Sequence, residues 1–430
     1  VLFRSRFPYL AAKYGGGIFL LVYIILALTF GYTLIMAETS LGRMTRKSPV
    51  GAFESFGNSR FISIGGWINA IIPILIVPYY SVIGGWVIKY LIEYFAGHSK
   101  TLAGDAYFTT FISNGWSTEI CFIIFTLFTL GIIYAGVRNG IERVSKFMMP
   151  ILIVLSLIIA VYSVTRPGAI EGVKYFLVPN FDHFSWMTVV SAMGQMFYSL
   201  SIAMGILITF GSYMKKDTSI EKSTENVEIF DTAIAIMAGL MIIPAVFAFS
   251  GGNAETLKSG PALMFITIPK VFANMGFGTA IGVVFFLLVL FAAVTSSIAL
   301  TESAVSTFED ELHWSRKKST VFMGMVMLLL GTLSCLGYGP LANFKILGMQ
   351  FLDFFDFITN SVMMPIAAIA TCLLVSKVVG VDKIEEEIKK DGQVFRRKKI
   401  FCFMIKYLCP LFAAIILISS VANAFGIITM

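Results

Sequence analysis

Long apolar segments, separated by shorter polar connections, run through the whole chain. A helix needs about 20 mostly apolar residues to cross a bilayer. Ten segments meet this requirement: 18–40, 67–95, 118–136, 144–165, 185–213, 230–250, 278–308, 319–336, 347–375 and 400–425. A shorter piece, 1–14, contains Phe7-Pro8-Tyr9 and is interpreted as the outer half of a cut helix. The pattern therefore predicts an all-α integral membrane protein with eleven spans.

Composition and charge support this class and predict an orientation. Only 13% of the 430 residues are charged and 57% are hydrophobic, whereas soluble domains are about a quarter charged. Connections 41–60, 137–147, 213–229, 309–320 and 376–400 hold 21 Lys and Arg residues, and the alternate connections hold 7. Basic connections stay in the cytoplasm. We expect a multi-pass protein of the plasma (inner) membrane with its C-terminus outside, and no nucleic-acid partner for its net charge of +7.

Cysteine and histidine usage offers no enzyme chemistry. The five cysteines are odd in number, form no CxxC pair and are interpreted as free thiols in helices. The three histidines, His98, His183 and His313, are far apart in sequence. We therefore predict no zinc site, no catalytic residue and no enzyme activity.

Five ionisable residues within or beside the apolar segments are candidates for function: Glu38, Asp231, Asp353, Asp356 and Arg6. Charged side chains inside a membrane are costly and usually functional. Asp353 and Asp356 are three residues apart on one helical face, and Arg6 is a plausible partner for one of them. Asp231, near the start of its apolar segment, fits either a helix N-cap or a ligand of a buried cation.

Two serines and a glutamine stand among small residues in the middle of the fifth segment, within residues 194–205. Backbone unwinds at membrane depth only where it lines a cavity, and the ends of such half-helices bind ions and substrates. Taken alone, these residues slightly favour the other interpretation, a continuous helix that uses small residues for packing.

Hydroxyl groups also gather in the seventh segment, at Thr295-Ser296-Ser297. Sodium is a hard cation and, by analogy with calcium and magnesium, should prefer oxygen ligands. Two hydroxyls and nearby backbone carbonyls would suit it. Hydrogen bonds from the hydroxyls to the preceding helical turn are an equally good interpretation.

Two connections differ from the rest. Residues 96–117 are polar and resemble a soluble segment. Residues 251–276 are apolar but too interrupted to span a membrane. We interpret the second as a re-entrant hairpin that covers a cavity, with an amphipathic surface loop as the alternative.

Eight motifs occur in the order in which the neurotransmitter:sodium symporter family has them, and the chain resembles a bacterial member of that family. They are Arg6-Phe7-Pro8-Tyr9 with Gly15-Gly16-Gly17, Glu38 through Arg43, Tyr79-Tyr80 with Gly85-Trp86, Gly140 through Arg143 with Met149-Pro150, Gln195 through Gly205, Thr295-Ser296-Ser297, Phe308 through Leu312, and Phe351 through Asp356. The resemblance implies a single transporter domain with the LeuT-type fold. Two inverted five-helix repeats, 1–165 and 185–375, would be joined by an outer connection, 166–184. A cytoplasmic loop, 376–399, and a final helix, 400–425, would follow, and the first and sixth helices would be broken.

The same resemblance implies two sodium sites. Ser199 and Asp231 would ligate the sodium beside the substrate, where most relatives have Asn in place of Asp231. The Ala292 carbonyl and the hydroxyls of Thr295 and Ser296 would hold the second ion. Chloride supplies a negative charge near Asp231 in animal relatives, so we predict that this protein does not require chloride.

The resemblance also implies a substrate pocket between two gates. Tyr80 would hydrogen-bond the substrate carboxylate, and Ile76, Ile83, Tyr198, Ser199, Ser201, Ala203, Met204 and Leu300 would line the pocket. These side chains suit a hydrophobic or aromatic amino acid, although Ala203, where relatives often have Gly, takes away room. Arg6, Gln195, Tyr198 and Asp356 would form the outer gate, and Tyr213 and Asp310 would belong to the inner gate.

The chain departs from the family pattern at its start. Relatives carry an unwound stretch before Arg6 that supplies ligands to both sodium sites and to the substrate. Here Val1 through Ser5 are interpreted as foreign sequence after an N-terminal truncation, and the inner-gate Arg that would pair with Asp310 is missing. The functional prediction therefore refers to the full-length parent: a sodium-coupled amino-acid importer in the lipid bilayer. A proton-coupled amino-acid or amine permease of the same fold is the nearest alternative, and a channel or receptor is a further one.

Overall fold

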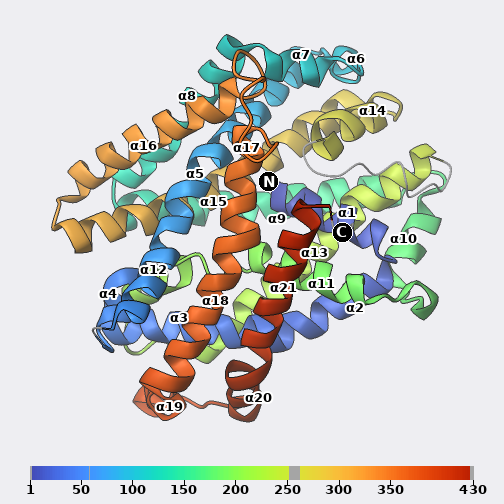
Figure 1. Ribbon diagram of the computed structural model, residues 1–430. Coiled ribbons are helices and arrows are strands. Elements are labelled where there is room, and N and C mark those ends of the chain that lie inside the picture. Colours follow the sequence, from blue (N-terminus) through green and yellow to red (C-terminus); the bar gives the residue numbers. More distant parts are fainter. Residues whose placement is uncertain (1, 58, 251–261, 427–430) are drawn as a thin grey trace.

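The computed structural model describes residues 2–57, 59–250 and 262–426, with side chains from Phe7 onward except that of Asp391. Within these ranges the protein is helical and contains no β-strand (Figure 1). Nine helical segments of this part of the chain are long and apolar enough to cross a membrane. Five of them are single helices: α5 (Arg60–Phe95), α8 (Gly115–Tyr134), α13 (Ile220–Ser250), α15 (Gly278–Leu312) and α16 (Arg316–Leu336).

The other four spanning segments contain π-helical turns. They are α2–η1–α3 (Gly17–Leu26, Ala27–Gly31, Tyr32–Thr45), η2–α9 (Val137–Glu142, Arg143–Val164), α17–η6–α18–η7 (Phe351–Asp356, Phe357–Met363, Met364–Leu373, Leu374–Val379) and α20–η9–α21 (Lys398–Phe403, Met404–Leu408, Cys409–Ala424). All nine correspond to predicted segments, with ends that differ by several residues. Shorter elements in the connections are α4 (Pro49–Glu54), α6 (Ser99–Leu102), α7 (Tyr107–Ser113), α10 (Ala169–Leu177), η3 (Phe181–His183), α19 (Val381–Ile388) and η8 (Lys390–Gly392).

The tenth predicted segment, 185–213, is broken. It forms α11 (Trp186–Ser199) and α12 (Ile206–Tyr213), with non-helical backbone between them. The continuous helix that these residues alone favoured is therefore wrong, and the break implied by the family resemblance is confirmed. Together with this pair and the short α1 (Leu2–Lys13), the nine long segments account for the eleven predicted spans.

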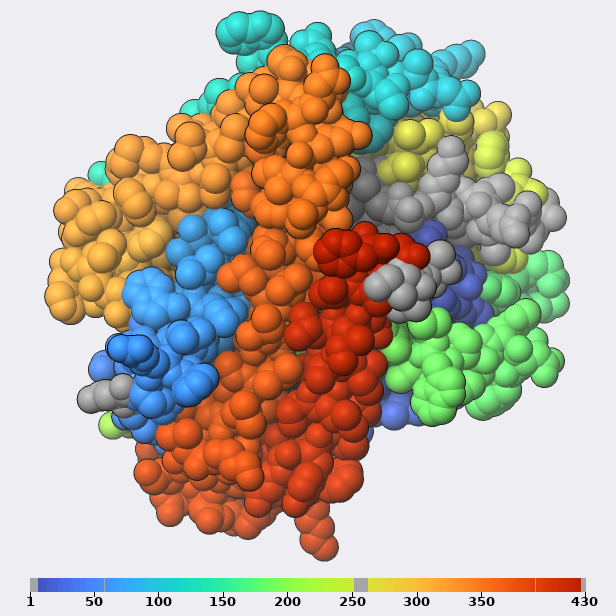
Figure 2. All heavy atoms as spheres, in the orientation of Figure 1, coloured from blue at the N-terminus to red at the C-terminus, as the bar shows by residue number. Residues whose placement is uncertain are grey.

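Helix α5 lies at the centre of the bundle, where it packs against α15, α8, α16 and α18. On the other side, α13 packs against α9, α10 and α1, and α3 packs against α12. The last contact is close because Gly42 lacks a side chain: a Cβ there would lie 2.0 Å from the Ile208 carbonyl oxygen. Helices α18 and α21 run side by side along one face, where Figure 2 shows their side chains interlocked without a gap.

Large apolar side chains remain exposed along the outward faces of the long helices. Leu127 of α8, Val154 of α9, Leu329 of α16 and Ile418 of α21 are between 55% and 69% exposed. In water, such a belt of apolar surface would favour aggregation. In a bilayer, it faces lipid chains, so it fits the predicted membrane class.

The two unusual connections pack near one another at one end of the bundle (Figure 1). Residues 96–117 form α6 and α7. The first part of the predicted hairpin, 251–261, lies outside the described residues, and the rest forms η5 (Leu263–Thr267) and α14 (Ile268–Ala273). Phe265 and Phe272 are each 1% exposed, and the Phe265 ring lies 5.8 Å from that of Trp86. This burial argues against an amphipathic surface loop.

Candidate functional site

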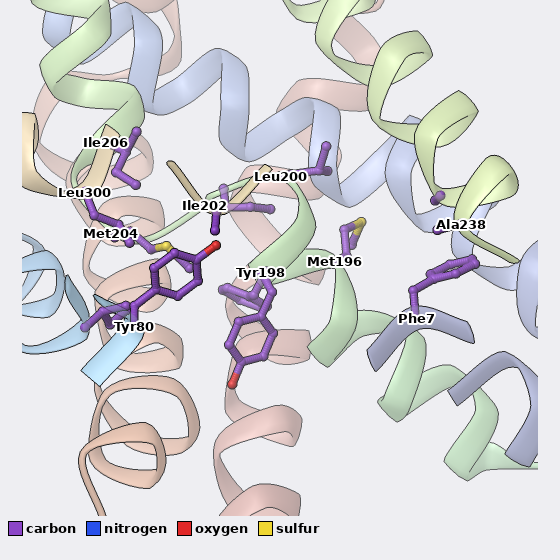
Figure 3. Close-up of a cluster of buried hydrophobic side chains, with 14 of the residues drawn as sticks. Phe7, Tyr80, Met196, Tyr198, Leu200, Ile202, Met204, Ile206, Ala238 and Leu300 are labelled. Carbon is purple, nitrogen blue, oxygen red and sulfur yellow. The ribbon is translucent and has the colours of Figure 1, made fainter. Parts of the chain in front are cut away.

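The break between α11 and α12 is set by three residues with left-handed backbone. Ser201 and Ala203 have φ of 55° and 57°, and Gly205 has φ of 68°. A helix cannot continue through such angles. The buried Glu38 of α3 accepts a hydrogen bond from the Ala203 amide at 2.8 Å, which replaces a helical partner of that N–H group. Figure 3 shows side chains of the break, including Ile202 and Met204, spread beside the Tyr80 ring.

Asp231 lies at the junction of three helices. Its Oδ1 accepts a hydrogen bond from Ser199 of α11, and its Oδ2 accepts one from Tyr23 of α2, each at 2.7 Å. Because α13 begins at Ile220, Asp231 lies in the helix interior, so the N-cap interpretation is wrong. The structure thus brings Ser199 and Asp231 together beside the break. Sequence reasoning missed Tyr23, although a tyrosine hydroxyl within an apolar helix usually needs a polar partner.

The hydroxyls of α15 bond to the preceding turn. Thr295 and Ser296 each donate to the Ala292 carbonyl, at 3.1 and 3.0 Å, and Thr295 also donates to Phe291. The back-bonding interpretation is confirmed, and the three predicted sodium ligands lie together on one turn. Ser297 faces another side, where Thr129 of α8 lies within hydrogen-bonding distance at 3.3 Å.

A cavity of about 90 Å³, the space open to the centre of a water molecule, lies beside the break. Its wall includes the predicted substrate residues Tyr198, Ser199, Ser201, Met204 and Leu300, and it also contains Asp231 and Ser296. The other predicted pocket residues, Ile76, Tyr80, Ile83 and Ala203, are at most 1% exposed and lie outside this wall. In Figure 3, Tyr80 and Leu300 lie on one side of Tyr198, and Phe7 and Ala238 lie on the other. The cavity therefore joins an apolar wall to the polar groups of both predicted ion sites.

The structure describes the side chains of three of the four predicted outer-gate residues. The Arg6 side chain lies outside the described residues. Gln195 and Tyr198 line the cavity. Asp356 accepts hydrogen bonds from Tyr79, at 3.3 Å, and from Asn360.

Asp353, the neighbour of Asp356 on the same helical face, has a different partner. It accepts a hydrogen bond from the Tyr338 hydroxyl at 3.2 Å. The two carboxylates, which the sequence placed on one face, are therefore held by separate groups.

The predicted inner-gate residues have partners that the sequence did not indicate. Tyr213 donates to Glu302 of α15 at 2.8 Å, and Arg316 forms an ion pair with the same carboxylate. Asp310 accepts a hydrogen bond from the Ser48 amide, at the start of α4. Glu302 is fully buried and was missed, although it stands only two residues after Leu300 in an apolar helix.

A helix broken beside a cavity, within a bundle of this topology, defines a multi-pass membrane transporter with the LeuT-type fold. A sequence profile of the Sodium:neurotransmitter symporter family matches residues 5–127 and 110–427, and the chain belongs to that family. The chain is 31% identical over 427 residues to an uncharacterized sodium-dependent transporter of Bacillus subtilis, YhdH, covering 99% of this chain and 93% of the relative. It is also 24% identical over 480 residues to the bovine sodium-dependent dopamine transporter, covering 97% of this chain and 66% of the relative.

A solved structure shares the fold. The structure of MhsT in complex with L-phenylalanine superposes with a TM-score of 0.86 at 32% sequence identity. The match covers 96% of this chain and 94% of MhsT. The predicted LeuT-type fold is therefore confirmed by a match to a solved structure over nearly the whole chain, and not only by the number of helices.

Proposed function

We propose that the protein is a symporter that imports a small hydrophobic or aromatic amino acid together with sodium. The observation that carries this proposal is the meeting of the α11–α12 break with Asp231, Ser199 and the oxygen-rich turn of α15 around one cavity. Broken helices at membrane depth provide backbone groups for ions and substrate where a continuous helix has none to spare. Sodium dependence agrees with the family and with the names of its members.

Two sodium ions are proposed to bind as cargo. The first would lie at Ser199 and Asp231, where a carboxylate supplies both charge and oxygen. The second would lie at the Ala292 carbonyl with the hydroxyls of Thr295 and Ser296. Oxygen ligands suit a hard cation. The family pattern adds further ligands from residues that precede Arg6.

The amino-acid substrate is proposed to lie between Tyr80 and the break. The Tyr80 hydroxyl would donate to the substrate carboxylate, and the apolar wall formed by Met204 and Leu300 would hold the side chain. Methionine is flexible and adapts to irregular shapes. MhsT, which is similar over nearly its whole length, was crystallised with L-phenylalanine.

Alternating access is proposed to come from the two gates and the two repeats, 1–165 and 185–375. The outer gate would comprise Arg6, Gln195, Tyr198 and Asp356, and the inner gate would include Tyr213 and Asp310. Coupling requires only that sodium favour the state that binds the amino acid, so each ligand tightens the other. The basic connections would face the cytoplasm, with connection 166–184 and the C-terminus outside.

Uptake into proteoliposomes that contain the protein tests this proposal. An inward sodium gradient at equal pH should drive uptake of a member of a labelled panel containing L-phenylalanine, L-leucine and L-tyrosine. A pH gradient without sodium should not. Uptake driven by the pH gradient alone would favour the proton-coupled alternative, in which Asp231 carries the proton.

A further inference from the structure

The carboxylate of Asp356 is held by two side chains that the proposed gate did not include. The Tyr79 hydroxyl lies 3.3 Å from its Oδ1, and the Asn360 amide nitrogen donates to the same oxygen. The Asn360 nitrogen also lies 3.2 Å from the Tyr79 hydroxyl, so the three groups form a closed triangle. Both bonds end on Oδ1, which leaves Oδ2 for other partners of this carboxylate.

Two members of this cluster are buried and Asp356 is half-buried, and the hydrogen bonds to its carboxylate are charge-assisted. Tyr79 is 1% exposed and Asn360 is 6% exposed. A carboxylate only accepts hydrogen bonds, so the amide must turn its N–H groups toward Asp356. Bonds to an ionised acceptor are roughly twice as strong as neutral ones. The arrangement therefore restricts the rotation of the Asp356 side chain.

The backbone around Asn360 places its side chain for this contact. Residues 357–363 form the π-helix η6, directly after Asp356, one of six π-helical segments among the described residues. Thr359, in the same turn, lies 3.4 Å from the Tyr79 hydroxyl. The π-helical turn thus gathers two polar side chains around Tyr79.

Tyr79 also links this cluster to the centre of the protein. It is adjacent to Tyr80 on α5, and the Tyr80 ring extends to the α11–α12 break (Figure 3). The preceding residue, Pro78, lies within α5 and cannot donate a backbone hydrogen bond, which loosens the helix locally. A small movement of this one turn would therefore shift both the Tyr80 ring at the break and the Tyr79 hydroxyl that bonds to Asp356.

We propose that Asn360 and Tyr79 are positioning residues that hold the Asp356 carboxylate in place for closure of the outer gate. The inference rests on the proposed function of Asp356 as a gate residue. Fixing the side chain before closure reduces the conformational entropy lost each time the gate closes. Without these two groups, the carboxylate would lose two of the hydrogen bonds that restrict its rotation, and the closed state would be less populated.

A double-mutant cycle tests this role. Ala238→Cys places a reporter thiol in the cavity wall, and a membrane-impermeant thiol reagent added outside right-side-out vesicles in sodium measures how often the outer pathway opens. We expect Asn360→Ala and Tyr79→Phe each to speed labelling, by about tenfold for a hydrogen bond to a charged group. Asp356→Asn should itself speed labelling, and in that background Asn360→Ala should add nothing further. Ser361→Ala, on the same π-helix, should label like the parent.

Two results would overturn the proposal: an unchanged labelling rate in Asn360→Ala, or an equal acceleration with and without the Asp356 carboxylate, which a merely structural role would give. Protein without the reporter gives the background of the native cysteines. The readout needs no transported substrate. Failure of sodium-driven uptake, with this labelling pattern intact, would therefore count against the proposed function and not against the positioning role.

Discussion

Sodium-driven uptake is expected to fall by a factor of about 100 or more in chloride-free medium when Asp231 is replaced by asparagine. Asp231 is the single acidic side chain among the described residues of the cavity wall. Its carboxylate accepts hydrogen bonds from both Tyr23 and Ser199. Removing one member of a buried charge pair costs about 3–5 kcal/mol, and each 1.4 kcal/mol is about tenfold in affinity. A sodium ion at this site would lose its counter-charge, so the measurement is initial uptake in proteoliposomes with gluconate as the anion.

Chloride distinguishes this explanation from general damage. The parent protein should transport equally in chloride and in gluconate, because Asp231 supplies the negative charge. The Asp231→Asn variant should recover part of its uptake when chloride is added, since the hydroxyls of Tyr23 and Ser199 can donate to a bound anion. Asp217→Asn, in an exposed position before α13, should behave like the parent. Loss of parent uptake in gluconate would show that the carboxylate does not replace chloride.

The second large effect is expected on stability. Replacing Arg43 by methionine should lower the melting temperature of the purified protein by roughly 5–10 °C. Glu387 would lose its buried partner and keep only its ion pair with the half-exposed Lys390, and breaking a buried ion pair costs about 3–5 kcal/mol. Arg43 lies at the end of α3, and its side chain is 1% exposed. It pairs with Glu387 of α19 at 2.7 Å and donates to the Thr218 carbonyl at 2.6 Å. One side chain therefore ties α19 and the connection before α13 to α3.

A compensating variant separates lost charge pairing from lost packing. Arg43→Met combined with Glu387→Leu should recover most of the stability, because apolar residues can replace a buried ion pair with little cost. Lys389→Ala removes a partly exposed ion pair with Glu385, which keeps its ion pair with Lys398, and should change the melting temperature little. Equal melting temperatures for Arg43→Met and Lys389→Ala would show that the buried pair of Arg43 and Glu387 does not stabilise this end of the bundle.

The spans could be predicted from sequence because each depends on local composition. Lipid requires a long apolar run wherever the chain crosses, whatever its neighbours are. The break at 200–205 could not be derived in the same way. It depends on Glu38, which lies 165 positions earlier and accepts the Ala203 amide. Only the order of motifs, which carries information about the whole fold, predicted it.

The candidate site shows the same limit at the level of single side chains. Ser199 and Asp231 were named from the family pattern and meet in the structure. Tyr23 was missed because its partner, Asp231, lies 208 positions away in the sequence. Asn360 was missed although its partner, Asp356, lies only one helical turn away, because that spacing is not a recognisable motif. Glu302 was overlooked within an apolar helix, although its buried charge required a partner such as Arg316.

Reciprocal binding at equilibrium tests the central claim, sodium coupling, most directly. Radiolabelled L-phenylalanine would be titrated onto the purified protein at several sodium concentrations, and radiolabelled sodium at several L-phenylalanine concentrations. The proposed symport predicts that each ligand tightens the other by the same factor, about tenfold or more. L-phenylalanine binding that is equally tight with and without sodium would contradict it.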